Sequence, residues 1–208
     1  MAGKITFVDQ GFAQDEIALV ERRAAARSLV GQRIVRVAYV DIDYRGWDLG
    51  FQDQSSRRAI TDAAEWSEPT WNAGTFHHLD FGVELTTDRG ETWGITWDSP
   101  SVVDGESIRL QRDSVSDVGA VWDVTEWEPW QSCLSAPVSD IVLRYHRWSD
   151  YSSGFWCTRV TLLFNDSRVE VLLGDCDQSG ALTPSSDNLA VLFDIAALPQ
   201  WERTDDLV

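Results

Sequence analysis

Apolar and polar residues alternate along two long stretches of the chain, and these stretches indicate how the rest is organised. In residues 80–98 two alternating runs meet at Asp88-Arg89-Gly90-Glu91, a typical turn sequence of a β-hairpin. A similar pattern covers residues 156–175. The sequence therefore predicts two β-hairpins.

Shorter patterns predict the elements around the hairpins. Residues 15–29 begin with acidic side chains and end with basic ones, which favours an amphipathic helix. Its apolar side would carry Ile17, Val20, Ala24 and Leu29. The pattern also predicts strands at residues 33–44, 107–111 and 138–145, apolar runs at 120–122 and 187–198, and short helices at 57–66 and 125–134.

The strand, the hairpin and the closing apolar run recur in the same order, which suggests an internal duplication. Val83 corresponds to Val160 and Trp122 to Phe193. The first copy would span about residues 13–130, with an insertion at about 45–75, and the second about 126–201. Chance likeness between alternating hairpins is the competing explanation. The predicted fold is α+β to mostly β, a single domain over residues 1–208. It would consist of antiparallel sheet or sheets from two pseudo-repeated helix-strand-hairpin units, with short helices at the ends.

Acidic residues dominate the composition. The 208 residues include 34 acidic and 17 basic side chains, which gives a formal net charge of -17. Such a charge argues against a nucleic-acid partner or an anionic membrane and favours a cationic partner, although adaptation to solvent would also explain it. The stretch from Asp98 to Trp130 holds only Arg109 and Arg112 as bases against eight acids: Asp98, Asp104, Glu106, Asp113, Asp117, Asp123, Glu126 and Glu128.

The first thirty residues bear on the location of the protein, and the three cysteines bear on disulfide and zinc chemistry. The first thirty residues lack a long apolar run, so we expect no signal peptide, no membrane span and a cytoplasmic protein. Three cysteines in no zinc-binding spacing argue against a disulfide framework or a zinc site. If the second hairpin turns at Asp166-Ser167, Cys157 and Cys176 face each other across the strands, either as reduced thiols or as a labile disulfide.

Carboxylates supply the candidate ligand-binding chemistry. Asp98, Asp175 and Asp177 could bind a small ligand or a divalent cation between the two copies, with Asp175 and Asp177 in a loop that partly matches a calcium-binding pattern. Asp123 and Asp194 form a second matched pair. Helix or turn capping is the more common role of such aspartates. We therefore predict no metal site, no cofactor and no catalytic residue. The alternative hypothesis of an enzyme is a carboxylate-based hydrolase.

Tryptophans supply candidate contact residues. Of the eleven in the chain, Trp47, Trp66 and Trp71 lie in the unmatched insertion. They could anchor a partner or fasten the long loop as a small satellite core.

Together these patterns favour a non-catalytic acidic binding protein of the immunity or inhibitor kind that neutralises a basic protein. The expected contact residues are Trp47, Trp66, Trp71, Asp104, Glu106, Asp113, Asp117, Glu126 and Glu128. The alternative is a small-ligand or divalent-cation-binding β module with Asp98, Asp175 and Asp177 between the repeats.

Overall fold

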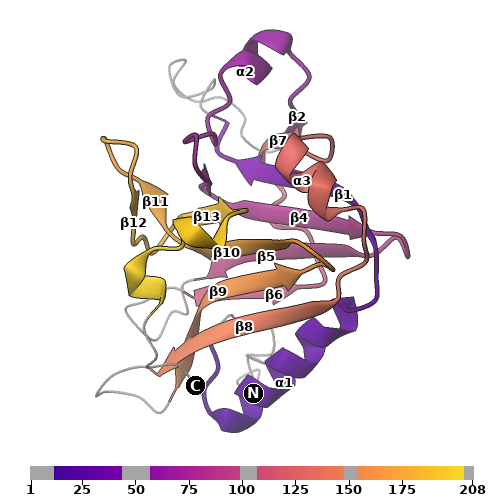
Figure 1. The fold of residues 1–208 in the computed structure, drawn as a ribbon, viewed down its shortest axis with the longest axis vertical. Coiled ribbons are helices and arrows are strands. Elements are labelled where there is room, and N and C mark those ends of the chain that lie inside the picture. Colours follow the sequence, from indigo (N-terminus) through magenta and orange to yellow (C-terminus); the bar gives the residue numbers. More distant parts are fainter. Residues whose placement is uncertain (1–11, 44–56, 99–106, 148–153, 204–208) are drawn as a thin grey trace, which may run out of the picture.

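Two β-sheets form the framework, and side chains from both sheets meet in one hydrophobic core (Figure 1). The computed structural model describes residues 12–43, 57–98, 107–147 and 154–203. Strands make up 42% of the structure and helices 19%. The β-rich character expected from the alternating patterns is confirmed.

The first sheet has six strands in the order β2-β7-β1-β4-β5-β6. All neighbouring strands are antiparallel except β2 and β7, which are parallel. The strands are β1 (Ile34–Asp41), β2 (Arg57–Ala59), β4 (Gly82–Thr87), β5 (Thr92–Asp98), β6 (Ser107–Gln111) and β7 (Gly119–Asp123).

The second sheet has five antiparallel strands in the order β3-β13-β10-β9-β8, and a small ribbon pairs β11 with β12. These strands are β3 (His77–Leu79), β8 (Asp140–Arg147), β9 (Phe155–Leu163), β10 (Arg168–Leu173), β11 (Asp175–Cys176), β12 (Leu182–Thr183) and β13 (Leu189–Leu192). The helical elements are α1 (Glu16–Ala26), η1 (Arg27–Leu29), α2 (Ala63–Ser67), α3 (Glu128–Cys133), η3 (Ile195–Ala197) and η4 (Gln200–Glu202).

The helix expected at residues 15–29 is confirmed as α1 and η1, but it buries a different side from the predicted one. Asp15 caps its N-terminus by accepting a hydrogen bond from the backbone N–H of Ala18 at 2.8 Å. Leu19 and Leu29 enter the core. Ile17 and Val20 are 70% and 63% exposed, so the predicted apolar side was wrong at these two positions.

The first hairpin is confirmed as β4 and β5. The N–H of Thr87 donates to the carbonyl of Glu91 at 2.9 Å, and Gly90 adopts a φ of 75°. A positive φ suits glycine because a Cβ atom would clash with the backbone there. The turn residues therefore set this hairpin locally.

The predicted duplication is wrong, and the claimed pair of helix-strand-hairpin units is not seen. In the first sheet the closing strand β7 pairs with β1, on the far side of β1 from the hairpin. In the second sheet the corresponding strand β13 pairs with β10, the last arm of its hairpin. The two halves thus differ in strand order. They share alternating patterns because antiparallel strands with one buried face produce such patterns whatever their connection.

The predicted pairing of Cys157 with Cys176 is also wrong. The register joins Leu163 to Arg168 and Arg159 to Leu172, which places the turn one residue earlier than expected. Cys176 instead pairs with Leu182 in the β11–β12 ribbon, and both thiols are free. A one-residue difference in turn position changes every cross-strand partner.

The face of the second sheet that points away from the core carries a buried group of charges. Glu170 on β10 is 1% exposed and lies against Arg159 on β9, with 3.4 Å between Arg159 Nε and Glu170 Oε2. Arg168 also pairs with Glu170, and the Thr161 hydroxyl donates to Glu170 Oε2 at 2.5 Å. The C-terminal turn η4 adds Glu202, whose Oε2 lies 3.8 Å from Arg159 Nη1.

Candidate functional site

Aromatic side chains from several elements form one cluster that includes Trp66 of α2 and Trp127 beside α3. Figure 1 shows where α2 and α3 lie in the fold. Trp71 is the centre of this cluster and is fully buried. Its ring meets Tyr39, His77 and Trp127 edge-on, with centroids 5.2, 4.6 and 5.1 Å away. Trp71 is therefore a core residue, and this corrects its prediction as a partner contact.

Two tryptophans cover the outer side of the cluster. Trp66 from α2 and Trp127 from the residue before α3 are half-buried, and their rings stack with centroids 6.3 Å apart. The Trp66 indole N–H donates to the carbonyl of Ile60 at 3.2 Å. The stacked pair joins α2 to the segment before α3, which are far apart in the sequence. Each of the two residues keeps part of its surface exposed to solvent.

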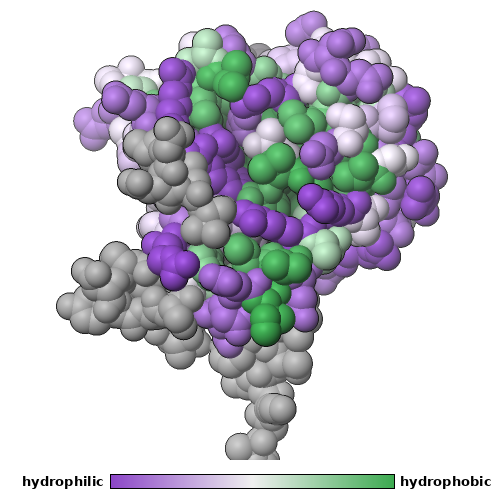
Figure 2. Space-filling model, turned by 60° about the horizontal axis from the view of Figure 1, so that its bottom comes forward, coloured by the Kyte–Doolittle hydropathy of each residue, from purple (hydrophilic) through white to green (hydrophobic). Residues whose placement is uncertain are grey.

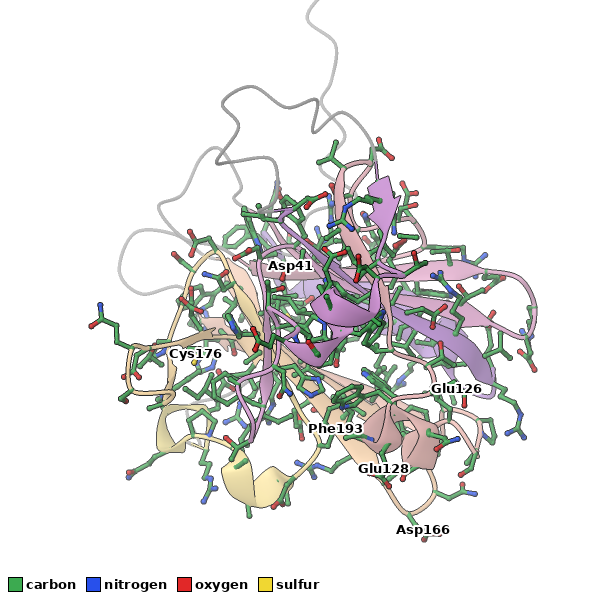
Figure 3. The ribbon with its side chains drawn as sticks, turned by 90° about the horizontal axis from the view of Figure 1, so that it is seen from above. Asp41, Glu126, Glu128, Asp166, Cys176 and Phe193 are labelled. Carbon is green, nitrogen blue, oxygen red and sulfur yellow. The ribbon has the colours of Figure 1, made fainter. Side chains whose placement is uncertain are left out.

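Exposed carboxylates lie beside this stacked pair. Glu126 and Glu128 are exposed at the start of α3, and Figure 3 places them on the same side of the molecule as Asp166 of the β9–β10 turn. Their described contacts are with uncharged side chains, since Glu126 accepts from Gln131 and Glu128 from Ser132. We refer to Trp66, Trp127, Glu126 and Glu128 as the α2–α3 surface.

The arginines near this surface are held by other carboxylates. Arg58 pairs with Asp43 at 2.6 Å and with Glu65 at 2.8 Å. Arg36 pairs with Asp123 at 2.7 Å, and Arg57 pairs with Glu84. Because these cations are compensated locally, they do little to offset Glu126 and Glu128.

A chain of buried hydrogen bonds lies under the tryptophans. The indole N–H of Trp130 donates to the Tyr39 hydroxyl at 2.8 Å, and this hydroxyl lies 2.7 Å from His77 Nδ1. Burial, followed by the neighbouring His78, lowers the pKa of His77 to about 4. His77 is therefore neutral at pH 7, and a hydrogen bond joins its Nδ1 to the Tyr39 hydroxyl. The chain fixes the cluster rather than supplying a proton.

A pair of carboxyl groups lies at the end of β1. Asp41 is 3% exposed, accepts from the backbone N–H of Asp80 at 3.0 Å and accepts from the Thr70 hydroxyl at 2.9 Å. Burial, followed by hydrogen bonding and charge repulsion from the Asp80 side chain, raises the pKa of Asp41 to about 7. Asp41 can therefore hold a proton near neutral pH, a property that the sequence pattern did not reveal.

The aspartates predicted as a ligand site do not form one cation site. Asp98 on β5 lies 3.7 Å from Arg109, while Asp175 on β11 lies 3.5 Å from His78. Asp177 accepts bonds from Ser179 and Ala181 within its own turn, so its carboxylate caps that turn. Within the described part of the chain, no three His, Cys, Asp or Glu side chains are placed to hold a metal ion.

The second predicted aspartate pair also has local roles. Asp123 accepts from Thr125 and pairs with Arg36, and Asp194 caps η3 through the backbone N–H of Ala196. These contacts are the capping explanation that the sequence left open. Of the other predicted contact residues, Asp113 and Asp117 are exposed in the β6–β7 connection, and Trp47, Asp104 and Glu106 lie outside the described residues.

Comparisons with known proteins place no limit on the function. No family model matches the chain, and no curated protein or solved structure is significantly similar to it. No helix in the described ranges has the length and apolar character that crossing a membrane requires. Function must therefore be argued from the arrangement of the side chains themselves.

Proposed function

We propose that this protein is a non-catalytic binding protein that covers or neutralises a positively charged partner protein through the α2–α3 surface. The observation that carries the proposal is the combination of a partly buried stacked pair, Trp66 and Trp127, with the exposed carboxylates Glu126 and Glu128 on either side of Trp127 in the chain. Aromatic anchors and charges at one place are the usual ingredients of a tight protein interface.

The two kinds of side chain have separate tasks in this proposal. A net charge of -17 attracts a basic partner over distances comparable with the screening length, about 8 Å at physiological salt. Trp66 and Trp127 then offer ring faces to arginine or lysine side chains, a contact that contributes about 0.5–2 kcal/mol each. Trp71, Tyr39 and Trp130 hold this surface rigid from beneath, so little entropy is lost on binding.

The test compares two variants of equal charge. Glu126→Gln/Glu128→Gln removes two charges from the α2–α3 surface, and Glu16→Gln/Glu21→Gln removes two exposed charges from α1 at the other end of the molecule (Figure 1). Each is used for affinity capture from an extract of the source cell at low and high salt. Any captured protein is then purified and its affinity is measured by calorimetry.

We expect one basic protein to bind the wild type and the α1 variant alike, and the α3 variant at least about tenfold more weakly. Equal weakening by both variants would show that net charge alone is responsible. Capture of no basic protein at either salt concentration would contradict the proposal.

A further inference from the structure

A cavity of about 360 Å³ lies between α1, strand β6 and strand β8. Three arginines line it from two parts of the chain: Arg22 comes from α1, while Arg109 lies in β6 and Arg112 directly after it. Figure 2 turns the α1 end of the molecule toward the reader, where apolar side chains lie among strongly polar ones. No residue of the α2–α3 surface is among its described lining residues.

The floor of the cavity is apolar and well fixed. Trp93, Ile108 and Tyr145 are each less than a tenth exposed, and they belong to the common core of the two sheets. The Arg112 guanidinium lies over the Trp93 ring with its Cζ atom 5.2 Å from the centroid. Such stacking holds a guanidinium in place while its N–H groups stay available to a ligand.

The charge of the lining is opposite to that of the protein. Acidic residues outnumber basic ones by 34 to 17 in the chain, yet the described lining contains three arginines and no Asp or Glu. Two of the arginines pair with carboxylates outside the lining, with Asp98 3.7 Å from Arg109 and Glu91 3.3 Å from Arg112. These acids do not line the cavity, but they offset part of the positive charge of Arg109 and Arg112.

We propose that this cavity binds a small organic anion, with an oxyanion group held by Arg109 and Arg112 and a compact apolar body lying against Leu110 and Leu143. A guanidinium presents paired N–H donors that match a carboxylate or a phosphate. The volume is near the lower limit for ligand sites, about 300 to 1,000 Å³, so the ligand is small.

The net charge of -17 opposes the approach of an anion, but distance decides the balance. At physiological salt the screening length is about 8 Å, so acids at the opposite end of the molecule act weakly in the cavity. Asp98 and Glu91, at 3.7 and 3.3 Å from Arg109 and Arg112, are close enough to reduce the attraction. Contacts with the lining arginines are direct and screened much less. A charge-assisted hydrogen bond contributes about 1.5–3 kcal/mol, enough to favour an anion over a neutral molecule of the same shape.

The first experiment compares four probes that share a phenyl group. Phenylacetate and phenyl phosphate carry the oxyanion, and phenylacetamide and 2-phenylethanol are neutral counterparts. We expect both anions to bind at millimolar concentration or below, and the neutral probes at least about tenfold more weakly. Calorimetry gives the affinity, and the difference between the two anions shows whether carboxylate or phosphate is preferred. In an NMR titration, the indole N–H signal of Trp93 should shift and that of Trp130 should not.

The second experiment locates the charge. Arg112→Gln removes a half-exposed lining arginine and should weaken phenyl phosphate binding about fivefold to tenfold. Arg147→Gln removes an exposed arginine of β8 that does not line the cavity, and should change the affinity less than about twofold. Arg109→Gln should act like Arg112→Gln, and a melting curve checks its folding.

Three results would overturn the inference. Equal affinity for neutral and anionic probes would mean that the arginines do not select charge. Equal weakening by Arg112→Gln and Arg147→Gln would mean that only the overall field is responsible. Absence of binding by both anions, with wild type folded, would mean that the cavity is a packing space without a ligand.

Discussion

The two sheets bury a carboxyl group in different ways. Glu170 of the second sheet is 1% exposed and is surrounded by Arg159, Arg168 and the Thr161 hydroxyl. Asp41 of the first sheet is 3% exposed and has another acid, Asp80, as its neighbour. In the second sheet, arginine side chains neutralise the charge of Glu170. In the first sheet, Asp41 is neutralised by holding a proton.

This difference shows where the molecule can respond to pH. A buried charge without compensation costs several kcal/mol, so each site needs one of the two solutions. An arginine keeps its charge at any physiological pH, whereas the proton on Asp41 is released as the pH rises through about 7. The Asp41 site of the first sheet therefore responds to pH, and so does Glu202 beside the second sheet, whose pKa burial also raises.

The largest expected effect comes from removing the central arginine of the second sheet. Arg159→Met leaves Glu170 and Glu202 without their shared cation and should lower the free energy of unfolding by about 3–5 kcal/mol. Arg89→Met in the exposed β4–β5 turn is the control and should change it by less than about 0.5 kcal/mol. Urea denaturation measures both. Replacing the pair, Arg159→Met/Glu170→Leu, should recover much of the loss; a double variant as unstable as the single one would contradict this account.

The next effect concerns Asp41 and the direction of its pH dependence. The pKa of Asp41 is about 7 in the folded protein and 3.8 in a model peptide, so between these values the folded state holds a proton that the unfolded chain releases. Its contribution to stability is complete below pH 3.8 and is lost as the pH rises to about 7. The loss amounts to at most about 4 kcal/mol.

Asp41→Asn tests this contribution, because an amide stays neutral and can still bond to Thr70 and Asp80. We expect unfolding free energies of wild type and variant to be similar at pH 4 and the variant to be the more stable at pH 8. Burial also raises the pKa of Glu202, which adds a slope of the same sign to both proteins. Parallel profiles would therefore show that Asp41 is not the titrating group.

A smaller effect is expected when the neighbour of Asp41 changes. Asp80→Asn removes charge repulsion but leaves the burial of Asp41, which is the larger cause of its raised pKa. The pH-dependent loss of stability should shrink by roughly 1 kcal/mol and end at a lower pH. Thermal melting from pH 4 to pH 8 measures the shift. An unchanged profile would mean that Asp80 has no influence on the proton.

The smallest effect is expected at the α2–α3 surface. Glu126→Gln/Glu128→Gln alters exposed side chains in contact with Gln131 and Ser132, so stability should change by less than about 0.5 kcal/mol. Urea denaturation checks this value. A larger loss would show that these glutamates hold α3 in place, and a loss of partner binding could then not be assigned to direct contact.

The two hairpins show which features of a strand pair the sequence specifies and which it does not. The first turn, Asp88-Arg89-Gly90-Glu91, was predicted correctly because Gly90 and its neighbours specify the turn locally. The second turn was placed one residue too late, which gave Cys157 the wrong partner. Alternation has a period of two, so it shows that two strands form but fixes neither their exact register nor their neighbours.

The candidate sites show the same limit. The exposure of Glu126 and Glu128 agrees with their polar character, but Trp71 could not be recognised as core because its neighbours come from β1, β3 and the segment before α3. The arginine-lined cavity was also missed. Its sequence signal was weak: Arg109 and Arg112 are the two bases within an acid-rich stretch.

The sequence by itself determined the helix at α1, the two hairpins, the β-rich character and the net charge. These properties depend on residues close together in the chain or on composition. The tertiary structure alone decided the strand order, the side of α1 that is buried, the raised pKa of Asp41 and the gathering of Arg22, Arg109 and Arg112. These depend on contacts between distant segments, whose free energy comes from burial and charge at the place where the segments meet.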